Sequence, residues 1–385
     1  MVSMVKNLFF GKNKKNEDNL DNNAIELATQ RQLIWRRFKR HRLGFTASIV
    51  VILFYLVVLF ADFLSTAPPV DYAAARGYMP PQPVKFFQNG HFMSTCEVTG
   101  ERNMDTFLME FTENCDNAEG ITFFGKGYEY KLWGVLSTDR HILGMKDQTK
   151  DPNAWIHLFG TDKQGRDVFS RTMHATRVSL TIGLVGVALS IIFGIFLGAI
   201  SGYYGGLIDS LIQRFIEIIR SVPTIPLYMG LSSAFPDDWT INQVYFMITV
   251  IISLFAWTDL ARVIRGRFLA LKDEDFVTAA RLNGAKTMRV IFVHMLPSFY
   301  SHIIAQASLA LPLMIVTETS LSFLGLGLRP PAVSYGVLLK DAQNVQSVAN
   351  MPWLFIPAIA VVLVILALNF MGDGIRDAAD PYQEV

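Results

Sequence analysis

The segment 120–127, GITFFGKG, is the stretch of this chain whose residue types come nearest to a nucleotide-binding motif. Its spacing follows the phosphate-binding loop G-x-x-x-x-G-K-[ST] as far as Lys126. Gly127 stands where that loop needs a hydroxyl to hold magnesium, and Phe123 and Phe124 place aromatic rings where the phosphates would lie. We therefore interpret the match as chance and expect the chain to bind no nucleotide and no cofactor of its own.

Other catalytic patterns are missing from the sequence. The seven histidines and two cysteines show no spacing typical of zinc sites, and no G-x-S-x-G nucleophile motif occurs. A net charge of +1 gives no basic footprint for nucleic acid. These observations predict that the chain is not an enzyme and binds neither a metal nor nucleic acid.

Three charged side chains lie in or beside long apolar segments, where ionisable groups are expensive. Glu217 and Arg220 precede Pro223 and Pro226, which would kink or break a helix, and Glu318 stands between two threonines. These charges could line a polar translocation path. Alternatively, they reach out to lipid headgroups or cap helix ends. The residues alone leave both interpretations open.

The segment 273–297 is too polar and too rich in cations to cross a bilayer, although apolar segments flank it. Three carboxylates at its start favour a helix N-terminus and Asn283-Gly284 supplies a stop, so a short helix is predicted over 276–282. Ala279 and Ala280 would let a partner surface approach the backbone closely. We interpret the helix as a docking element; a simple linker between two membrane helices is the alternative.

Cys96 and Cys115 are the only cysteines, and both lie in one long loop. A disulfide between them would close a loop of about 20 residues and stabilise the fold by about 3 kcal/mol on loop-entropy grounds. The alternative is a pair of free thiols. We predict the disulfide on the expectation that the loop is extracytoplasmic.

Composition indicates a membrane protein, because 51% of the 385 residues are hydrophobic and only 17% are charged. A basic run at 31–42 precedes the first apolar segment, which is too far from the start for a signal peptide and is predicted to be a retained anchor. Each apolar segment reaches the ~20 residues that a spanning helix needs. The six expected spans are 44–64, 178–203, 212–235, 241–261, 295–317 and 353–372.

Charge bias sets the expected orientation. Six spans that begin on the side of the basic N-terminus place 262–294, which carries many Lys and Arg residues, on that same side. The rule therefore predicts that both termini are cytoplasmic.

The loop after the first span falls outside, and its Pro-rich punctuation, Asn89-Gly90 turn signal and β-favouring clusters predict a small β-rich insert. Glycines recurring along 183–202 predict a close helix-packing face.

From Gly160 onward the chain resembles the C-type permease subunit of dipeptide, oligopeptide and nickel ABC importers. The motifs that carry this resemblance are GTDKQGRDVFSR at 160–171, GYYGG at 202–206, TAARLNGAK at 278–286, LSFLGLG at 321–327 and NFMGDGIRDAADP at 369–381. The resemblance implies an all-α polytopic membrane protein with six transmembrane helices of the type I ABC importer permease kind. The β-rich insert between the first and second helices is longer than in the shortest family members, and its role does not follow from the family.

The resemblance also implies roles for particular residues. The segment 276–297 is similar to the cytoplasmic EAA loop, the coupling helix that sits in a groove of the ATPase subunit, with Thr278 in place of the usual Glu. The implied ATPase-coupling residues are Phe276, Thr278, Ala279, Ala280, Arg281 and Gly284. The outer segment 321–341 is implied to help gate the cavity. The expected path or gate residues are Glu318, Ser322, Phe323 and Arg220.

The implied function is that of one permease subunit in an ATP-driven importer of peptides that works by alternating access. Oligosaccharides or nickel are alternative cargoes, and an ion-gradient-driven secondary carrier is the alternative of another class. The implied partners are a homologous second permease, two ATPase subunits that use ATP and Mg, an extracytoplasmic substrate-binding protein and membrane lipid. The implied location is a prokaryotic cytoplasmic membrane.

The chain is expected to divide into five parts. They are a tail at 1–43, the first helix at 44–64, the insert at 65–160, a core at 161–375 with a coupling loop at 270–297, and a tail at 376–385.

Overall fold

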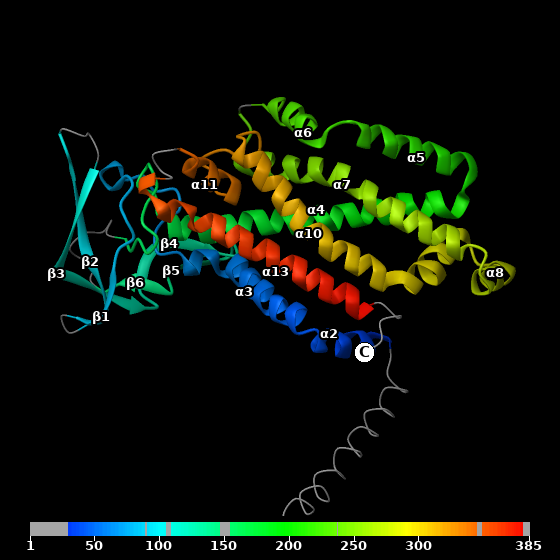
Figure 1. Cartoon of the computed structure of the whole chain (residues 1–385), viewed down its shortest axis with the longest axis horizontal. Coiled ribbons are helices and arrows are strands. Elements are labelled where there is room, and N and C mark those ends of the chain that lie inside the picture. The colour runs from blue at the N-terminus through cyan, green and yellow to red at the C-terminus, as the bar shows by residue number, and fades with distance from the viewer. Residues whose placement is uncertain are drawn as a thin grey trace, which may run out of the picture.

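The computed structural model describes residues 30–88, 91–104, 109–146, 155–236, 238–344 and 349–379. Over these residues the chain is an elongated bundle of helices with a small β-rich part at one end (Figure 1). Within the described ranges, five helical segments are long and apolar enough to cross a membrane, which confirms five of the six expected spans. They are α3 (Arg42–Leu64), α4 (Val168–Tyr204), α7 (Ile241–Leu271), Thr287–Phe323 and Pro352–Ala379.

The remaining expected span, 212–235, is divided between two shorter helices. α5 (Gly206–Ser221) ends before Pro223, and α6 (Thr224–Ser233) begins directly after it. Proline lacks the amide hydrogen that would continue the helical ladder, so it breaks the helix at this point. The two helices together run along the same length of the bundle as α7 (Figure 1).

α4 lies at the centre of the bundle and packs closely against α7. A Cβ atom on Gly198 would lie 2.6 Å from the carbonyl oxygen of Ala261, and one on Gly202 would lie 2.6 Å from Cβ of Phe268. Only glycine permits this approach of two helix backbones. The predicted glycine packing face is therefore confirmed.

The segment after α7 turns back on itself at the end of the bundle. α8 (Asp275–Leu282) is followed by the short α9 (Thr287–Arg289), a π-helical turn at Val290–Met295 and a 3-10 turn at Leu296–Phe299. α10 (Tyr300–Phe323) then runs back along the bundle. The boundaries of α8 agree with the predicted helix at 276–282 to within one residue.

The first and last membrane helices pack side by side. α2 (Gln30–Arg40) leads into α3, and a 3-10 turn at Pro352–Phe355 leads into α13 (Ile356–Ala379). A Cβ atom on Gly44 would lie only 2.9 Å from Cα of Gly374, so the two helices nearly touch there. The start of α3, the end of α13 and α8 all lie toward the end of the bundle away from the insert (Figure 1).

The insert is β-rich, as expected. Four antiparallel strands pair in the order β1, β2, β3, β6, and β4 pairs with β5 in a separate hairpin. The predicted turn at 89–90 lies outside the described residues, but β1 and β2 pair on either side of it. The strands are β1 (Val84–Gln88), β2 (His91–Arg102), β3 (Met109–Phe123), β4 (Lys126–Leu132), β5 (Leu136–Arg140) and β6 (Leu143–Met145).

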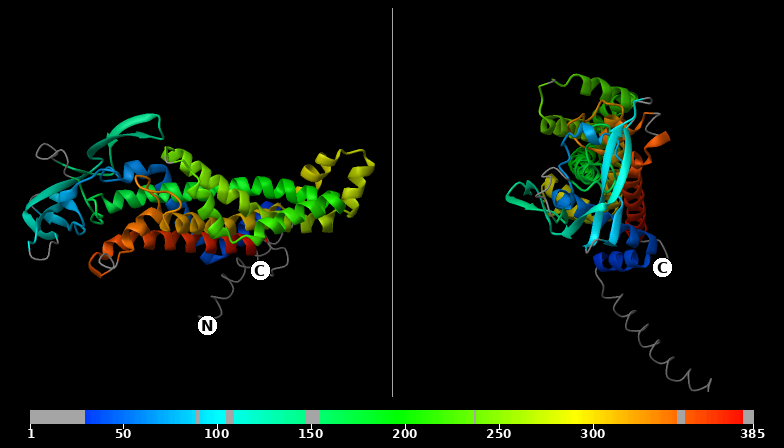
Figure 2. Two further views of the ribbon diagram at one scale, coloured as in Figure 1. Left: turned by 90° about the horizontal axis from the view of Figure 1, so that it is seen from above. Right: turned by 90° about the vertical axis from the view of Figure 1, so that its left-hand side faces the viewer.

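Polar bonds join the insert, α3 and α4 at the place where α3 ends and α4 begins. The amide of Ile142 donates to the carbonyl of Phe63 at 2.8 Å, and Arg177 of α4 pairs with Asp62 of α3 at 2.7 Å. The side chain of Ser170 accepts from the amide of Thr66 at 3.0 Å. The insert is therefore fixed at the end of the bundle where α3 ends and α4 begins (Figure 2).

Candidate functional site

α8 stands clear of the bundle at the end opposite the insert (Figure 1). Of the six predicted coupling residues, five are exposed: Phe276, Thr278, Ala279, Arg281 and Gly284. Ala280 differs, because it is only 9% exposed and belongs with Val277 to the cluster of apolar side chains beneath the helix. Ala280 therefore holds α8 in place from behind, while the other five form its outward surface.

Gly284 ends α8 through its backbone. Its φ of +76° lies in the left-handed region, where a side chain would be strained. Its amide donates to the carbonyl of Arg281 at 2.9 Å, and the amide of Ala285 donates to that of Ala280 at 3.1 Å. This termination is typical of glycine after a helix. The Arg281 guanidinium also lies 5.0 Å from the ring centre of Tyr203, which ties α8 to the end of α4.

A cavity of about 540 Å³ lies among α4, α5, α6, α7 and α10. Most of its wall is apolar, with a few hydroxyls and one amide, that of Gln306. Arg220 of α5 and Asp259 of α7 also line it and form an ion pair, although their side chains remain 41% and 72% exposed. A largely apolar cavity with a few convergent polar groups is the usual form of a site that binds a small molecule.

The sequence predicted Arg220 in this role but missed Asp259. The signal was present, because Asp259 lies near the end of an expected span, where an acidic residue is costly. Its pairing with a cation 39 residues earlier could be seen only in the folded chain. A second such pair, between Asp209 of α5 and Arg265 of α7, joins the two helices nearer α8 through two bonds of 2.5 and 2.6 Å.

Glu318 is fully buried and does not line the cavity. Ser179 of α4 and Ser322 of α10 each donate to one of its carboxylate oxygens at 2.8 Å. The hydroxyl of Ser322 also accepts a hydrogen bond from the amide of Leu328 at 3.1 Å. The hydroxyl of Ser179 accepts one from the amide of Tyr335 at 3.3 Å. Glu318 thus joins α4, α10 and the segment that leads into α11 (Tyr335–Ala342).

Glu318→Ala should destabilise the protein, because each buried hydroxyl left without an acceptor costs about 1–3 kcal/mol. Glu318→Gln should lose less stability than Glu318→Ala, since one acceptor oxygen remains. The measurement is the apparent melting temperature of the purified chain in detergent. Glu217→Ala is the matched control, because Glu217 is an exposed glutamate that pairs with Arg214 of its own helix at 2.8 Å. Equal melting temperatures for Glu318→Ala and Glu217→Ala would contradict the role given to Glu318.

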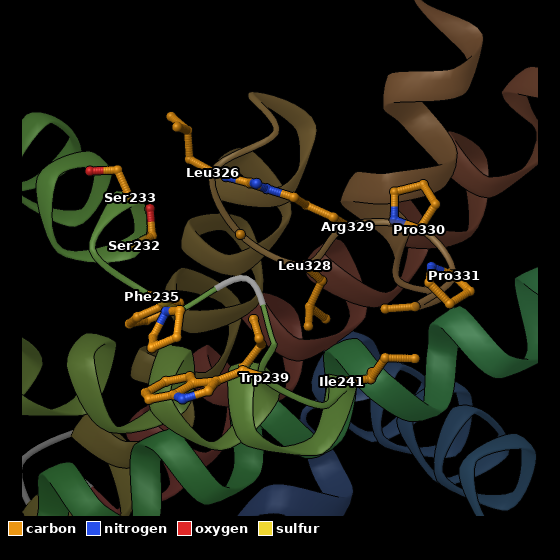
Figure 3. Close-up of a pocket in the computed structure, with 14 residues that line it drawn as sticks. Ser232, Ser233, Phe235, Trp239, Ile241, Leu326, Leu328, Arg329, Pro330 and Pro331 are labelled. Atoms are coloured by element: carbon orange, nitrogen blue, oxygen red, sulfur yellow. The ribbon is translucent and has the colours of Figure 1, made fainter.

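A second pocket, of about 300 Å³, lies where α6 ends and α7 begins (Figure 3). Phe235 and Trp239 stack there with ring centres 5.2 Å apart, and Leu326 to Ala332 form the opposite wall. Arg329 is exposed, and its side chain donates to the carbonyl of Gly325 at 3.1 Å. Phe323, one of the predicted gate residues, is half-buried just before this wall. The outer segment that Glu318 holds is therefore also the wall of this pocket.

The remaining predicted positions lie in the insert. Cys96 of β2 and Cys115 of β3 form a disulfide with an S–S distance of 2.03 Å. The segment 120–127 runs from the end of β3 into β4. A strand follows it directly, whereas a phosphate-binding loop needs a helix N-terminus at that point. The three parts of the site are thus α8, the cavity with its ion pair, and the outer pocket.

Comparison with known proteins places the chain in a family. It is 39% identical over 260 residues to the oligopeptide transport system permease protein OppC of Haemophilus influenzae, covering 67% of this chain and 78% of that protein. Residues 194–384 match the family described as binding-protein-dependent transport system inner membrane component. The chain belongs to this family of permeases. Residues 29–81 match the N-terminal TM domain of oligopeptide transport permease C.

Two further relatives of the permease extend the comparison. It is 34% identical over 255 residues to OppC of Bacillus subtilis, covering 66% of this chain and 77% of that protein. It is 31% identical over 353 residues to the dipeptide transport system permease protein DppC of Lactococcus lactis, covering 90% of this chain and 89% of that protein. Among solved structures it is similar to a chain of the inward-facing MetNI methionine ABC transporter, with a TM-score of 0.39, 17% identity, and 53% of this chain and 93% of that chain covered.

Proposed function

We propose that this permease is one of two homologous subunits that form the membrane pathway of an ATP-driven importer of peptides. The observation that carries the proposal is the exposed ion pair between Arg220 and Asp259 on the wall of the larger cavity. Charged groups facing lipid within a membrane segment are costly. A second permease subunit that covered this wall would turn it into a closed, polar pathway.

α8 is the proposed contact with the ATPase subunits. It is exposed at one end of the bundle, and its own apolar cluster holds it rigidly from behind. Two ATPase subunits, one on each permease, would bind and hydrolyse ATP with Mg. Their closing would move α8, and this movement would switch the cavity between an outward-open and an inward-open conformation. An extracytoplasmic binding protein would deliver the substrate at the end that carries the insert.

The orientation follows from charge. Arg262, Arg265, Arg267 and Lys272 lie toward the α8 end of α7, as the positive-inside rule requires of a cytoplasmic end. We therefore place α8 and both termini in the cytoplasm and the insert outside a prokaryotic inner membrane.

Peptides are the proposed cargo. The printed names of the relatives refer to oligopeptide and dipeptide transport. A free peptide carries an ammonium and a carboxylate, and the cavity wall offers one charge of each sign in Asp259 and Arg220. A neutral oligosaccharide offers no charge to either side chain, so the pair favours peptides.

The proposal predicts that vesicles containing the complete complex take up labelled peptide only when ATP and the binding protein are present. The measurement is uptake by proteoliposomes, with a hydrolysis-deficient ATPase subunit as control and with an oligosaccharide and nickel as competing cargoes. Uptake that continues without ATP hydrolysis but stops with an ionophore would indicate an ion-gradient-driven carrier and refute the proposal. Uptake of only the oligosaccharide or nickel would keep the ATP-driven machinery and refute the peptide cargo.

A further inference from the structure

The turn between β4 and β5 and the first residue of β5 carry three large apolar side chains that other described residues leave largely uncovered. Trp133 is 62% exposed, Val135 88% and Leu136 59%. We call these three residues the hairpin tip. Contiguous apolar side chains exposed on a loop mark a surface that is covered by something else.

The hairpin tip is bound to the first membrane helix. The indole nitrogen of Trp133 donates to the carbonyl oxygen of Leu59 at 2.9 Å, and its ring lies 5.7 Å from that of Phe60. Phe124, just before β4, lies 5.8 Å from Phe63. These contacts gather four aromatic rings around the outer end of α3. The hairpin projects from the side of the bundle there (Figure 2).

The contact with Leu59 fixes the depth of the hairpin tip. Leu59 lies five residues before α3 ends at Leu64 and directly before the kink at Phe60, so Trp133 is held more than one helical turn before that end. α3 is also the least covered of the five long helices. In its most apolar 18-residue stretch 17% of the residues are buried, compared with 33–39% in the other four helices. Ile52, Leu56 and Leu59 are among its exposed side chains. The hairpin tip therefore continues an apolar surface that already lies in the membrane.

The backbone of the turn supports a role for the side chain. Trp133 has a φ of +52°, a region that is costly for a bulky residue and is usually occupied by glycine or asparagine. Gly134, next to it, has a φ of +74°. Lys131 is exposed two residues earlier, where a long cationic side chain can reach lipid phosphates. Trp rings with one polar atom and nearby Lys side chains are typical of membrane interfaces.

We propose that the β4–β5 hairpin dips its tip into the lipid leaflet nearest the insert and anchors the insert to the membrane. The occupant of the apolar surface is thus lipid, because the surface is continuous with the lipid-facing side of α3. The anchor would fix the insert relative to the outer end of the pathway. This inference does not depend on the cargo or on ATP coupling.

Val135→Cys tests the proposal by placing a thiol on the hairpin tip. Because Cys96 and Cys115 are bonded to each other, the introduced thiol is the one that a label can reach. The full chain is labelled with an environment-sensitive fluorophore and placed in nanodiscs of phosphatidylethanolamine and phosphatidylglycerol. Met104→Cys is the matched control, since Met104 is 80% exposed on the insert beyond β2. We expect the label at 135 to emit at shorter wavelength than that at 104 and to be quenched more strongly by nitroxide lipids, most of all by those with the nitroxide near the headgroup.

Two results would overturn the proposal. Water-like emission at 135, with no more nitroxide quenching than at 104, would show that the hairpin tip lies in water. Quenching that disappears when the chain is assembled with the second permease, or when the binding protein is added, would show that a protein covers the tip. Quenching that persists in the assembled complex supports the lipid contact.

Discussion

Replacing Ala279 by arginine should abolish ATP-driven uptake while leaving the permease folded in the membrane. Ala279 is exposed on the outward surface of α8, where its small side chain would let the proposed ATPase partner approach the backbone. An arginine there would hold the two surfaces apart. A change at the centre of an interface typically costs about 2 kcal/mol or more, which corresponds to about a thirty-fold loss of affinity.

The measurement is co-purification of the ATPase subunits and substrate-stimulated ATP hydrolysis in vesicles. Ala74→Arg is the matched control, because it makes the same change at an exposed alanine of the insert, at the opposite end of the bundle from α8. It should leave both readouts near the unmodified level. Ala280→Arg should instead lower the melting temperature, since Ala280 is packed in the cluster beneath the helix. Unchanged stimulation in Ala279→Arg would show that α8 is only a linker.

The second large effect is expected for Arg171→Ala, in a cluster of charges at the outer end of α4. Arg171 is 1% exposed and lies 3.2 Å from Asp162 and 3.6 Å from Asp341. Arg166 pairs with the same two carboxylates at 2.7 and 3.1 Å. Removing one partner of a buried ion pair costs about 3–5 kcal/mol, and the remaining Arg166 should keep the loss near the lower figure.

The measurement is the melting temperature of the purified chain, with Arg329→Ala as the control for loss of an exposed arginine. The destabilisation should grow as the pH rises. Burial raises the pKa of Asp341, and Arg171 and Arg166 oppose that rise. Without Arg171 the pKa of Asp341 should rise further, so ionising it near neutral pH costs more in the folded state than in the unfolded state. A melting temperature equal to that of Arg329→Ala would contradict this role for the cluster.

This cluster shows where prediction from the sequence stops. The motif at 160–171 was recognised as a family signature, but nothing in it indicates that its charges hold α11. Asp341 lies 175 residues beyond Arg166, and the two meet only because α4 and α11 pack at the same end of the bundle. The same is true of Asp259, whose partner Arg220 comes from another helix.

Local patterns, in contrast, predicted the elements themselves. Apolar length located the five long helices, since a bilayer requires about 20 apolar residues whatever their partners. The carboxylates and Asn283-Gly284 bounded α8, because helix ends are set by residues within one turn. Pro223 indicated a kink or break, and the structure shows two separate helices. The β-favouring runs indicated strands in the insert, though not their order.

The sequence by itself therefore determined five of the six expected membrane spans, the bounds of α8 to within one residue, the β character of the insert and the family. Only the tertiary structure decided that Ala280 faces inward while Ala279 faces outward, that Glu318 is buried by two serines, and that the hairpin tip lies beside Leu59. The physical reason is range. Helix propensity, hydropathy and capping act between neighbours in the chain, whereas burial and ion pairing depend on which helices pack together.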